Sequence, residues 1–254
     1  DIPPLSADFT FFGGIYRGVQ LVTTEDIHFD MLNHGSGGVF IDSPQINAEE
    51  ASLRVRGKII NHSGQAGTVK VVSTFKIRGN EVLKVLTNSI QLTGEGEKEF
   101  EQTAEKVRGF ELWSPDNPAV YTIHTALYKD EVLIDEVFNP FGFRWFHFDA
   151  QEGFFLNDEP LKLMGANRHQ DRSGMGNALT DDMHRRDLEL LKDMGANFLR
   201  TAHYPQSEAG AVEKAIAYEL PFVTIHMTAI AGSDIEPSKI FQIISDSKEY
   251  PNVG

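Results

Sequence analysis

Two short polar segments in the second half of the sequence hold the residue types that a catalytic or binding site needs. One covers residues 167–171 (Asn-Arg-His-Gln-Asp) and the other covers residues 200–204 (Arg-Thr-Ala-His-Tyr). Together they supply two histidines, two arginines and one aspartate, side chains that donate or accept hydrogen bonds and bind charged groups. Each segment follows an apolar run, so the strands that these runs predict must position the chemistry.

The apolar runs predict parallel strands. Residues 161–166 and 196–199 are expected to form two of them, and residues 221–225 a third that ends at His226. Parallel α/β sheets and barrels place their active sites at the carboxyl ends of their strands. The two polar segments are therefore expected to lie on one rim.

A helix is predicted between the first two strands, over residues 181–194. Thr180 is the expected N-cap, and the two aspartates that follow it suit the positive end of the helix dipole. Gly195 stands where helices often end in a left-handed conformation. The expected buried stripe consists of Leu188, Leu191 and Met194.

The preceding part of the chain, from about residue 27 to residue 145, has a different pattern. Apolar and polar side chains alternate in short runs, as at residues 53–59 and 69–75, and turn-forming groups separate the runs. Roughly seven strands of this kind indicate an antiparallel β-sandwich without helices. The Asn-His-Ser triplet at residues 61–63 fits a glycosylation sequon, but in a hairpin turn we interpret it as turn chemistry. Trp113 is interpreted as a core residue of this sandwich.

The composition argues against several classes of partner. Lys and Arg number 23 against 37 Asp and Glu, a formal net charge of −14, which disfavours binding to nucleic acid. The absence of cysteine excludes disulfides and thiolate zinc sites within these residues. No apolar run approaches the roughly 18 residues of a membrane span, so no membrane partner is expected. Homo-oligomerisation and the cell compartment are left open, and the abrupt ends predict a segment of a longer protein.

Four motifs occur in a fixed order along the chain. They are Asp8-Phe9 with Gly13-Gly14-Ile15-Tyr16-Arg17, Leu112-Trp113-Ser114-Pro115-Asp116-Asn117-Pro118, Phe141-Gly142-Phe143-Arg144, and the stretch that contains both polar segments. In this order the chain resembles glycoside hydrolase family 2, the family of β-galactosidases, β-glucuronidases and β-mannosidases. The resemblance covers nearly the whole chain. It implies the end of a jelly-roll sugar-binding domain at residues 1–24, an immunoglobulin-like β-sandwich at residues 25–146, and the first part of a (β/α)8 TIM barrel at residues 147–254.

The resemblance implies a retaining exo-β-glycosidase for terminal β-linked sugars, closest to the β-galactosidase branch, with a carbohydrate substrate and neither cofactor nor metal. Such enzymes use one carboxylic acid to protonate the leaving oxygen and a second carboxylate to attack the anomeric carbon. Both are expected on later barrel strands, after Gly254, so residues 1–254 alone are expected to be inactive. The resemblance assigns substrate binding to His169, Asp171, His203 and Asp8, and supporting roles to Asn167 and Arg200. Arg200 is expected beside the nucleophile, where its charge keeps that carboxylate ionised.

Two alternatives stay open. His226 stands where the family usually has a carboxylate, and Ala217 and Leu220 stand where it has Asp and Gly, which favours an inactive carbohydrate-binding relative. The second alternative is a metal-dependent barrel hydrolase, because the strand ends carry zinc or manganese ligand types at His169, Asp171, His203 and His226. Purely structural roles also stay open. In these roles Asp8 and Asp171 are turn residues, and His169 and His203 form hydrogen bonds with backbone carbonyls.

Overall fold

The chain folds as two compact units, each of which is described by itself. The computed structural model describes residues 12–16, 19, 21–33, 36–77 and 81–202, and the backbone of residues 223–225. One unit includes residues 22–162, and the other includes residues 12–16, residues 163–202 and strand β14 (Val223–Ile225).

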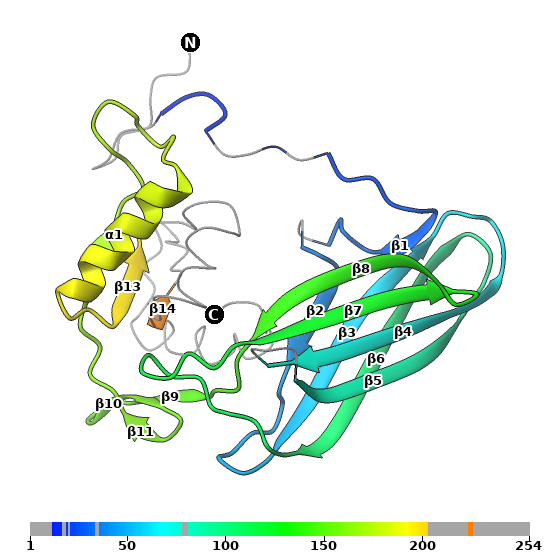
Figure 1. The fold of residues 1–254 in the computed structure, drawn as a ribbon, viewed down its shortest axis with the longest axis horizontal. Helices are drawn as coiled ribbons and strands as arrows, with labels where there is room; N and C mark the ends of the chain where they lie inside the picture. The colour runs from blue at the N-terminus through cyan, green and yellow to red at the C-terminus, as the bar shows by residue number, and fades with distance from the viewer. Residues whose placement is uncertain are drawn as a thin grey trace. The chain divides into compact units, whose positions relative to one another are not determined.

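Two four-stranded antiparallel sheets make up most of the first unit (Figure 1). In one sheet, β3 (Ala51–Asn61) pairs with β6 (Gly96–Val107) along its length, and with β1 (Ile27–Phe29) and β2 (Val39–Asp42) on its other edge. The second sheet has the order β5-β4-β7-β8. Its strands are β4 (Gly67–Lys76), β5 (Val82–Leu92), β7 (Tyr121–Lys129) and β8 (Val132–Phe141). The predicted β-sandwich is confirmed, with eight strands instead of roughly seven, and the described part of residues 50–110 contains no helix.

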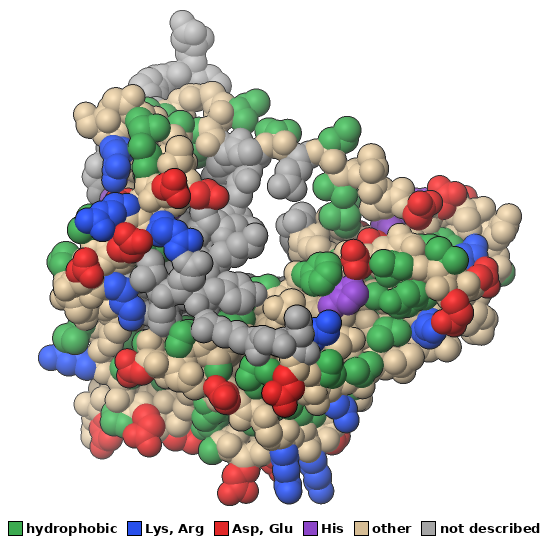
Figure 2. Space-filling model, viewed as in Figure 1, with side chains coloured by type: hydrophobic (Ala, Val, Ile, Leu, Met, Phe, Trp, Pro, Cys, Tyr) green, Lys and Arg blue, Asp and Glu red, His purple; other side chains and the backbone are tan. Residues whose placement is uncertain are grey.

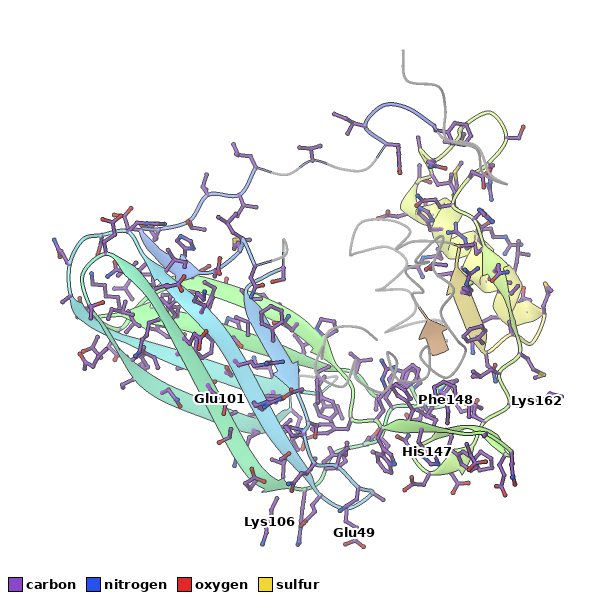
Figure 3. The ribbon with its side chains drawn as sticks, turned by 180° about the vertical axis from the view of Figure 1, so that it is seen from behind. Glu49, Glu101, Lys106, His147, Phe148 and Lys162 are labelled. Atoms are coloured by element: carbon purple, nitrogen blue, oxygen red, sulfur yellow. The ribbon has the colours of Figure 1, made fainter. Side chains whose placement is uncertain are left out.

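Period-two alternation forms the core of this sandwich. Along β4, Val69, Val71 and Phe75 point inward, and along β6 Phe100 lies inside while Glu101 lies outside (Figure 3). Removal of each large apolar side chain from water contributes roughly 1.5–3 kcal/mol. Charged side chains cover the outside of the sandwich and are mixed with apolar ones (Figure 2). The exposed apolar side chains include Val132, Leu133 and Phe138 on β8.

Two of the four sequence motifs pack on each other inside this unit. The buried ring of Phe143 stacks on Phe110 with 4.1 Å between centroids and meets the edge of Tyr121 at 5.1 Å. The backbone N–H of Trp113 donates to the carbonyl of Phe143 at 2.9 Å, and the guanidinium of Arg144 lies 4.7 Å from the Trp113 ring centroid. Desolvation lowers the pKa of Arg144. Trp113 is buried, as predicted for a core residue.

The Asn-His-Ser triplet is turn chemistry, as predicted. Asn61 is buried, and its Oδ1 accepts hydrogen bonds from the backbone N–H and the hydroxyl of Ser63. Its Nδ2 donates to the carbonyls of Gln65, Thr93 and Gly94. The amide that a glycan would occupy therefore closes two turns of the sandwich.

A small antiparallel sheet follows the sandwich within the first unit. It consists of β9 (Phe146–Asp149), β10 (Gly153–Leu156) and β11 (Glu159–Pro160). Asn157 and Asp158 connect the last two strands with φ angles of 54° and 65°, the left-handed pair that a two-residue hairpin turn requires. Strands β10 and β11 thus form a tight hairpin. His147 and Phe148 are neighbours on β9 (Figure 3) and point to opposite faces of this sheet.

The second unit contains a parallel sheet of order β12-β13-β14 and one helix, α1 (Asp181–Asp193). Strands β12 (Gly165–Arg168) and β13 (Phe198–Thr201) begin later than the predicted runs at residues 161–166 and 196–199. Parallel pairing starts at Gly165, where only glycine fits, because a Cβ atom there would lie 1.8 Å from the carbonyl oxygen of Phe198. The first residues of each polar segment belong to the strands.

Helix α1 begins after Thr180, as predicted, but its details differ from the prediction. The Thr180 hydroxyl makes no capping hydrogen bond. The predicted stripe holds for the fully buried Leu188, whereas Met194 is 79% exposed. At about 100° per residue, Met194 lies roughly 120° around the helix from Leu188, and His184 takes the buried position instead. Gly195 has φ +83°, as predicted for a left-handed helix end.

Candidate functional site

Asn167 and Arg200 are the first pair of site candidates that the structure brings together. They are directly opposite each other in the parallel register of β12 and β13, so their side chains share one face of the sheet. Arg200 Nη1 donates to Asn167 Oδ1 at 3.2 Å. The neighbouring Leu199 and Thr201 are buried on the opposite face, and helix α1 lies against this sheet (Figure 1). The polar face of the two strands is therefore the face that α1 leaves open.

Burial of the side chains alternates from Arg168, the last residue of β12, to Asp171. Arg168 is 7% exposed and Gln170 is 3% exposed, whereas His169 and Asp171 are exposed. The backbone carbonyl of Arg168 accepts a hydrogen bond from the N–H of Ala202 at 2.9 Å, which extends the pairing with β13 beyond Thr201. His169 and Asp171 are thereby accessible at the carboxyl end of β12, where a ligand of a parallel sheet is expected.

Helix α1 contributes two polar side chains that the sequence analysis missed, the half-buried Asp187 and the buried His184. Asp187 Oδ2 accepts from Arg168 Nη2 at 2.7 Å and from Arg168 Nε at 3.2 Å. His184 Nδ1 lies 2.8 Å from Arg168 Nη2. The available signal was the position of Asp187 and Leu188 three and four residues after His184, which places His184 next to each of them on the helix surface.

His184 is held in its neutral form. Arginine has no acceptor, so His184 Nδ1 must present its lone pair to Arg168, and the ring proton resides on Nε2. Burial lowers the pKa of His184, and the positive charge of Arg168 lowers it further. The arrangement thus fixes the tautomer of His184 and satisfies a buried guanidinium with two acceptors.

The comparisons with known proteins agree with this architecture. The family model for the TIM barrel domain of glycosyl hydrolases family 2 matches residues 150–220, and a second model of glycosyl hydrolases family 2 matches residues 38–144. The chain belongs to glycosyl hydrolase family 2. The parallel strands of the second unit are accordingly the start of a TIM barrel, and the sandwich is the domain that precedes the barrel in this family.

Relatives in family 2 carry two kinds of name. A β-glucuronidase from Bacteroides fragilis is 36% identical over 82% of this chain and 30% of its own length. A β-galactosidase from Thermoanaerobacter pseudethanolicus is 30% identical over 82% of this chain and 26% of its own length. The crystal structure of a Bacteroides uniformis β-glucuronidase superposes with a TM-score of 0.82 at 42% identity, over 89% of this chain and 27% of that one. The chain thus spans less than a third of the length of these relatives.

Several predicted site residues lie outside the described part of this family 2 chain. They are Asp8, His203 and His226, with the departures at Ala217 and Leu220. The predicted convergence of His203 with His169 therefore stays a prediction, as do the roles of Asp8 and the assignment of residues 1–24 to a jelly roll.

Within the described ranges, no three His, Asp or Glu side chains are placed to hold a metal ion. The metal-hydrolase alternative stays untested, because it also needs His203 and His226. No helix of the described residues has the length and apolar character to cross a membrane.

Proposed function

We propose that the intact protein carrying this chain is a retaining exo-β-glycosidase that removes terminal β-linked sugars. The observation that carries the proposal is the polar end of β12 and β13, where Asn167 and Arg200 share a face and His169 and Asp171 are exposed. Family 2 membership supports the reaction class, and the names of the relatives support a carbohydrate substrate.

In this proposal the described residues form the sugar-holding half of the site. His169 and Asp171 bind sugar hydroxyls, and His203 and Asp8 contribute from segments outside the described residues. Hydrogen bonds that tighten as the ring flattens toward an oxocarbenium ion lower the barrier more than they stabilise the bound substrate. Asn167 orients Arg200 through the 3.2 Å hydrogen bond, and Arg200 keeps the nucleophilic carboxylate ionised.

We place the acid and the nucleophile outside residues 1–254, on barrel strands that the resemblance locates further along the chain. In a retaining enzyme the two carboxyl groups stand about 5–5.5 Å apart, so that one protonates the leaving oxygen while the other forms the glycosyl-enzyme bond. Asp171 is not assigned to either role, because it occupies the sugar-binding position of the family motif.

The sugar is proposed to be a β-galactoside or a β-glucuronide. The sequence motifs favoured the galactoside, and the relatives with 36% and 42% identity are named β-glucuronidases. The two sugars differ at C6, where glucuronate carries a carboxylate, so a site for glucuronide needs an additional cationic or donor group. Asn167 and Arg200 have the same proposed roles for either sugar.

The experiment is a paired assay of the intact protein and of residues 1–254. We expect the intact protein to hydrolyse nitrophenyl β-glucuronide or β-galactoside with retention of anomeric configuration, as followed by NMR, and residues 1–254 to give no turnover. Inverted product or absence of turnover by a folded intact protein would contradict the proposal. Sugar binding without turnover would favour the inactive relative, and loss of activity on chelation would favour the metal hydrolase.

A further inference from the structure

One carboxylate on helix α1 binds both ends of the segment that carries His169 and Asp171. Asp187 Oδ2 accepts from Arg168, as described above, and Asp187 Oδ1 accepts from Arg172 Nη2 at 3.0 Å. Arg168 precedes His169 and Arg172 follows Asp171, so the three-residue span between the two arginines is tied to the helix at both of its ends. Each oxygen of Asp187 thus serves one arginine.

The two attachments differ in strength. Arg168 is buried and has a second acceptor in His184, and hydrogen bonds between ionised groups are roughly twice as strong as neutral ones. Arg172 is partly exposed, so its ion pair with Asp187 lies in the range of about 0–1 kcal/mol that surface pairs contribute. Arg172 is also fixed through its backbone, which exchanges hydrogen bonds with Gly176 at 3.1 Å and 2.9 Å. The buried end of the span, at Arg168, is therefore held more strongly than the exposed end, at Arg172.

The anchoring determines which side chains face outward. With Arg168 and Gln170 buried, the intervening His169 and Asp171 are the exposed residues of the span. A rotation of this backbone would exchange the two sets, because neighbouring side chains in extended backbone point in opposite directions. Asp187 opposes such a rotation, because the rotation would separate the buried guanidinium of Arg168 from the Asp187 carboxylate.

We propose that Asp187 is a positioning residue for the sugar-holding span, acting through Arg168 and Arg172 without touching the substrate. The proposal rests on the function proposed above, because His169 and Asp171 matter only if they hold the sugar. Asp187→Asn keeps the shape of the side chain but replaces one of its two acceptor oxygens with an NH₂ donor. This donor would face the guanidinium of Arg168 or of Arg172. One of the two attachments would then be lost.

The test uses Asp187→Asn and Arg172→Met in the intact protein, with Asp193→Asn as the matched control. Asp193 lies on the same helix and is exposed, and its side chain has no hydrogen bond or ion pair with any of the described residues. Hydrogen exchange of peptides covering residues 168–176 reports the span directly, and kcat and KM for an aryl β-glycoside report its consequence. The melting temperature shows whether each variant is folded.

We expect Asp187→Asn to accelerate exchange in residues 168–176 and to lower kcat/KM roughly tenfold or more, because misplacing a binding group by about 1 Å can cost up to 10²-fold. Arg172→Met should lower kcat/KM about threefold with a melting temperature within about 3 °C of the parent protein, since its ion pair is exposed. Asp193→Asn should change neither exchange nor kcat/KM.

Unchanged exchange in both Asp187→Asn and Arg172→Met would overturn the attachment itself. Faster exchange with kcat/KM within twofold of the parent protein would overturn the positioning role while leaving the attachment intact. If the parent protein hydrolyses no β-glycoside, the proposed function fails first, and the positioning role fails with it whatever the exchange data show. If Asp187→Asn does not fold, the exchange rates and kcat/KM of Arg172→Met still test both the attachment and the positioning role.

Discussion

The sandwich and the parallel unit bury different kinds of polar side chain. In the sandwich the buried polar residues are neutral, and they are Ser52, Asn61, Ser73, Gln102 and Thr125. The parallel unit, with far fewer described residues, buries the ionisable Arg168 and His184 in addition to the neutral Gln170 and Thr201. A buried group that can carry charge lowers stability unless it is paired and hydrogen-bonded, as Arg168 is.

This difference separates the sandwich, a scaffold, from the unit that carries the proposed site. The interior of the sandwich uses ring contacts and neutral hydrogen bonds, whereas its ion pairs, such as Arg54 with Asp42, lie nearer the surface. The parallel unit keeps a costly network directly behind the exposed His169 and Asp171. We infer that this network is retained for the geometry that it imposes, since apolar residues of similar volume could stabilise the same contact equally well.

The largest effect should come from breaking the packing of the sandwich. Phe143→Ala removes a fully buried ring between Phe110 and Tyr121, and we expect it to lower the free energy of unfolding by about 3–5 kcal/mol. Phe138→Ala is the matched control, because Phe138 is 59% exposed in the same unit. Urea unfolding followed by the fluorescence of the buried Trp113 measures both. Equal losses in the two variants would show that the ring cluster is not the core of this unit.

The next effect should appear in catalysis and not in stability. His169→Ala in the intact protein should lower kcat/KM for an aryl β-glycoside by roughly 10²-fold, about 2.7 kcal/mol, while the melting temperature stays near that of the parent protein because His169 is exposed. The matched control is His124→Ala in the sandwich. His124 Nε2 lies 2.7 Å from Glu136 Oε2, and neither residue is a predicted site residue. We expect it to leave kcat/KM unchanged. A comparable loss in both variants would remove the distinction between scaffold and site.

A smaller effect should appear as a pH dependence. The folded-state pKa of His184 is lowered from its ordinary value of 6.5 by burial and by Arg168, against weaker opposing effects of Asp187 and Asp181. Below pH 6.5 the unfolded chain therefore binds a proton that the folded chain does not, and stability falls as the pH drops toward the folded-state value. His184→Gln keeps an acceptor for Arg168 but cannot titrate. The stability advantage of the parent protein over this variant should shrink between pH 7.5 and pH 5.5, and parallel pH profiles would contradict the lowered pKa.

The same contrast explains what the sequence could predict. Alternation in β4 and β6 and the 3.6-residue period of α1 are local, so the sandwich, the helix limits and the left-handed Gly195 were predictable. The placement of Asn167 and Arg200 on one rim followed from the rule for strand ends, whereas their hydrogen bond depends on the register of the two strands. The contacts of Arg168 with His184 and Asp187 were not predictable, because they join a strand end to a helix face and depend on the register of β12 against β13. Met194 was assigned to the core because three-residue spacing was extended one position beyond the face that the helix buries.

The smallest expected effect concerns the start of α1, since sequence rules and structure disagree at that end of the helix and agree at the other. An N-cap threonine replaced by alanine typically costs about 1 kcal/mol. The Thr180 hydroxyl makes no capping hydrogen bond, and the helix start is satisfied by its carbonyl, which accepts from the N–H groups of Met183 and His184 at 3.0 Å and 3.1 Å. Alanine keeps that carbonyl, so Thr180→Ala should change the free energy of unfolding by less than about 0.5 kcal/mol. Gly195→Ala should cost about 1 kcal/mol or more, because φ is +83° there. Urea unfolding of both variants decides the matter: a loss near 1 kcal/mol in Thr180→Ala would mean that the hydroxyl caps the helix in solution.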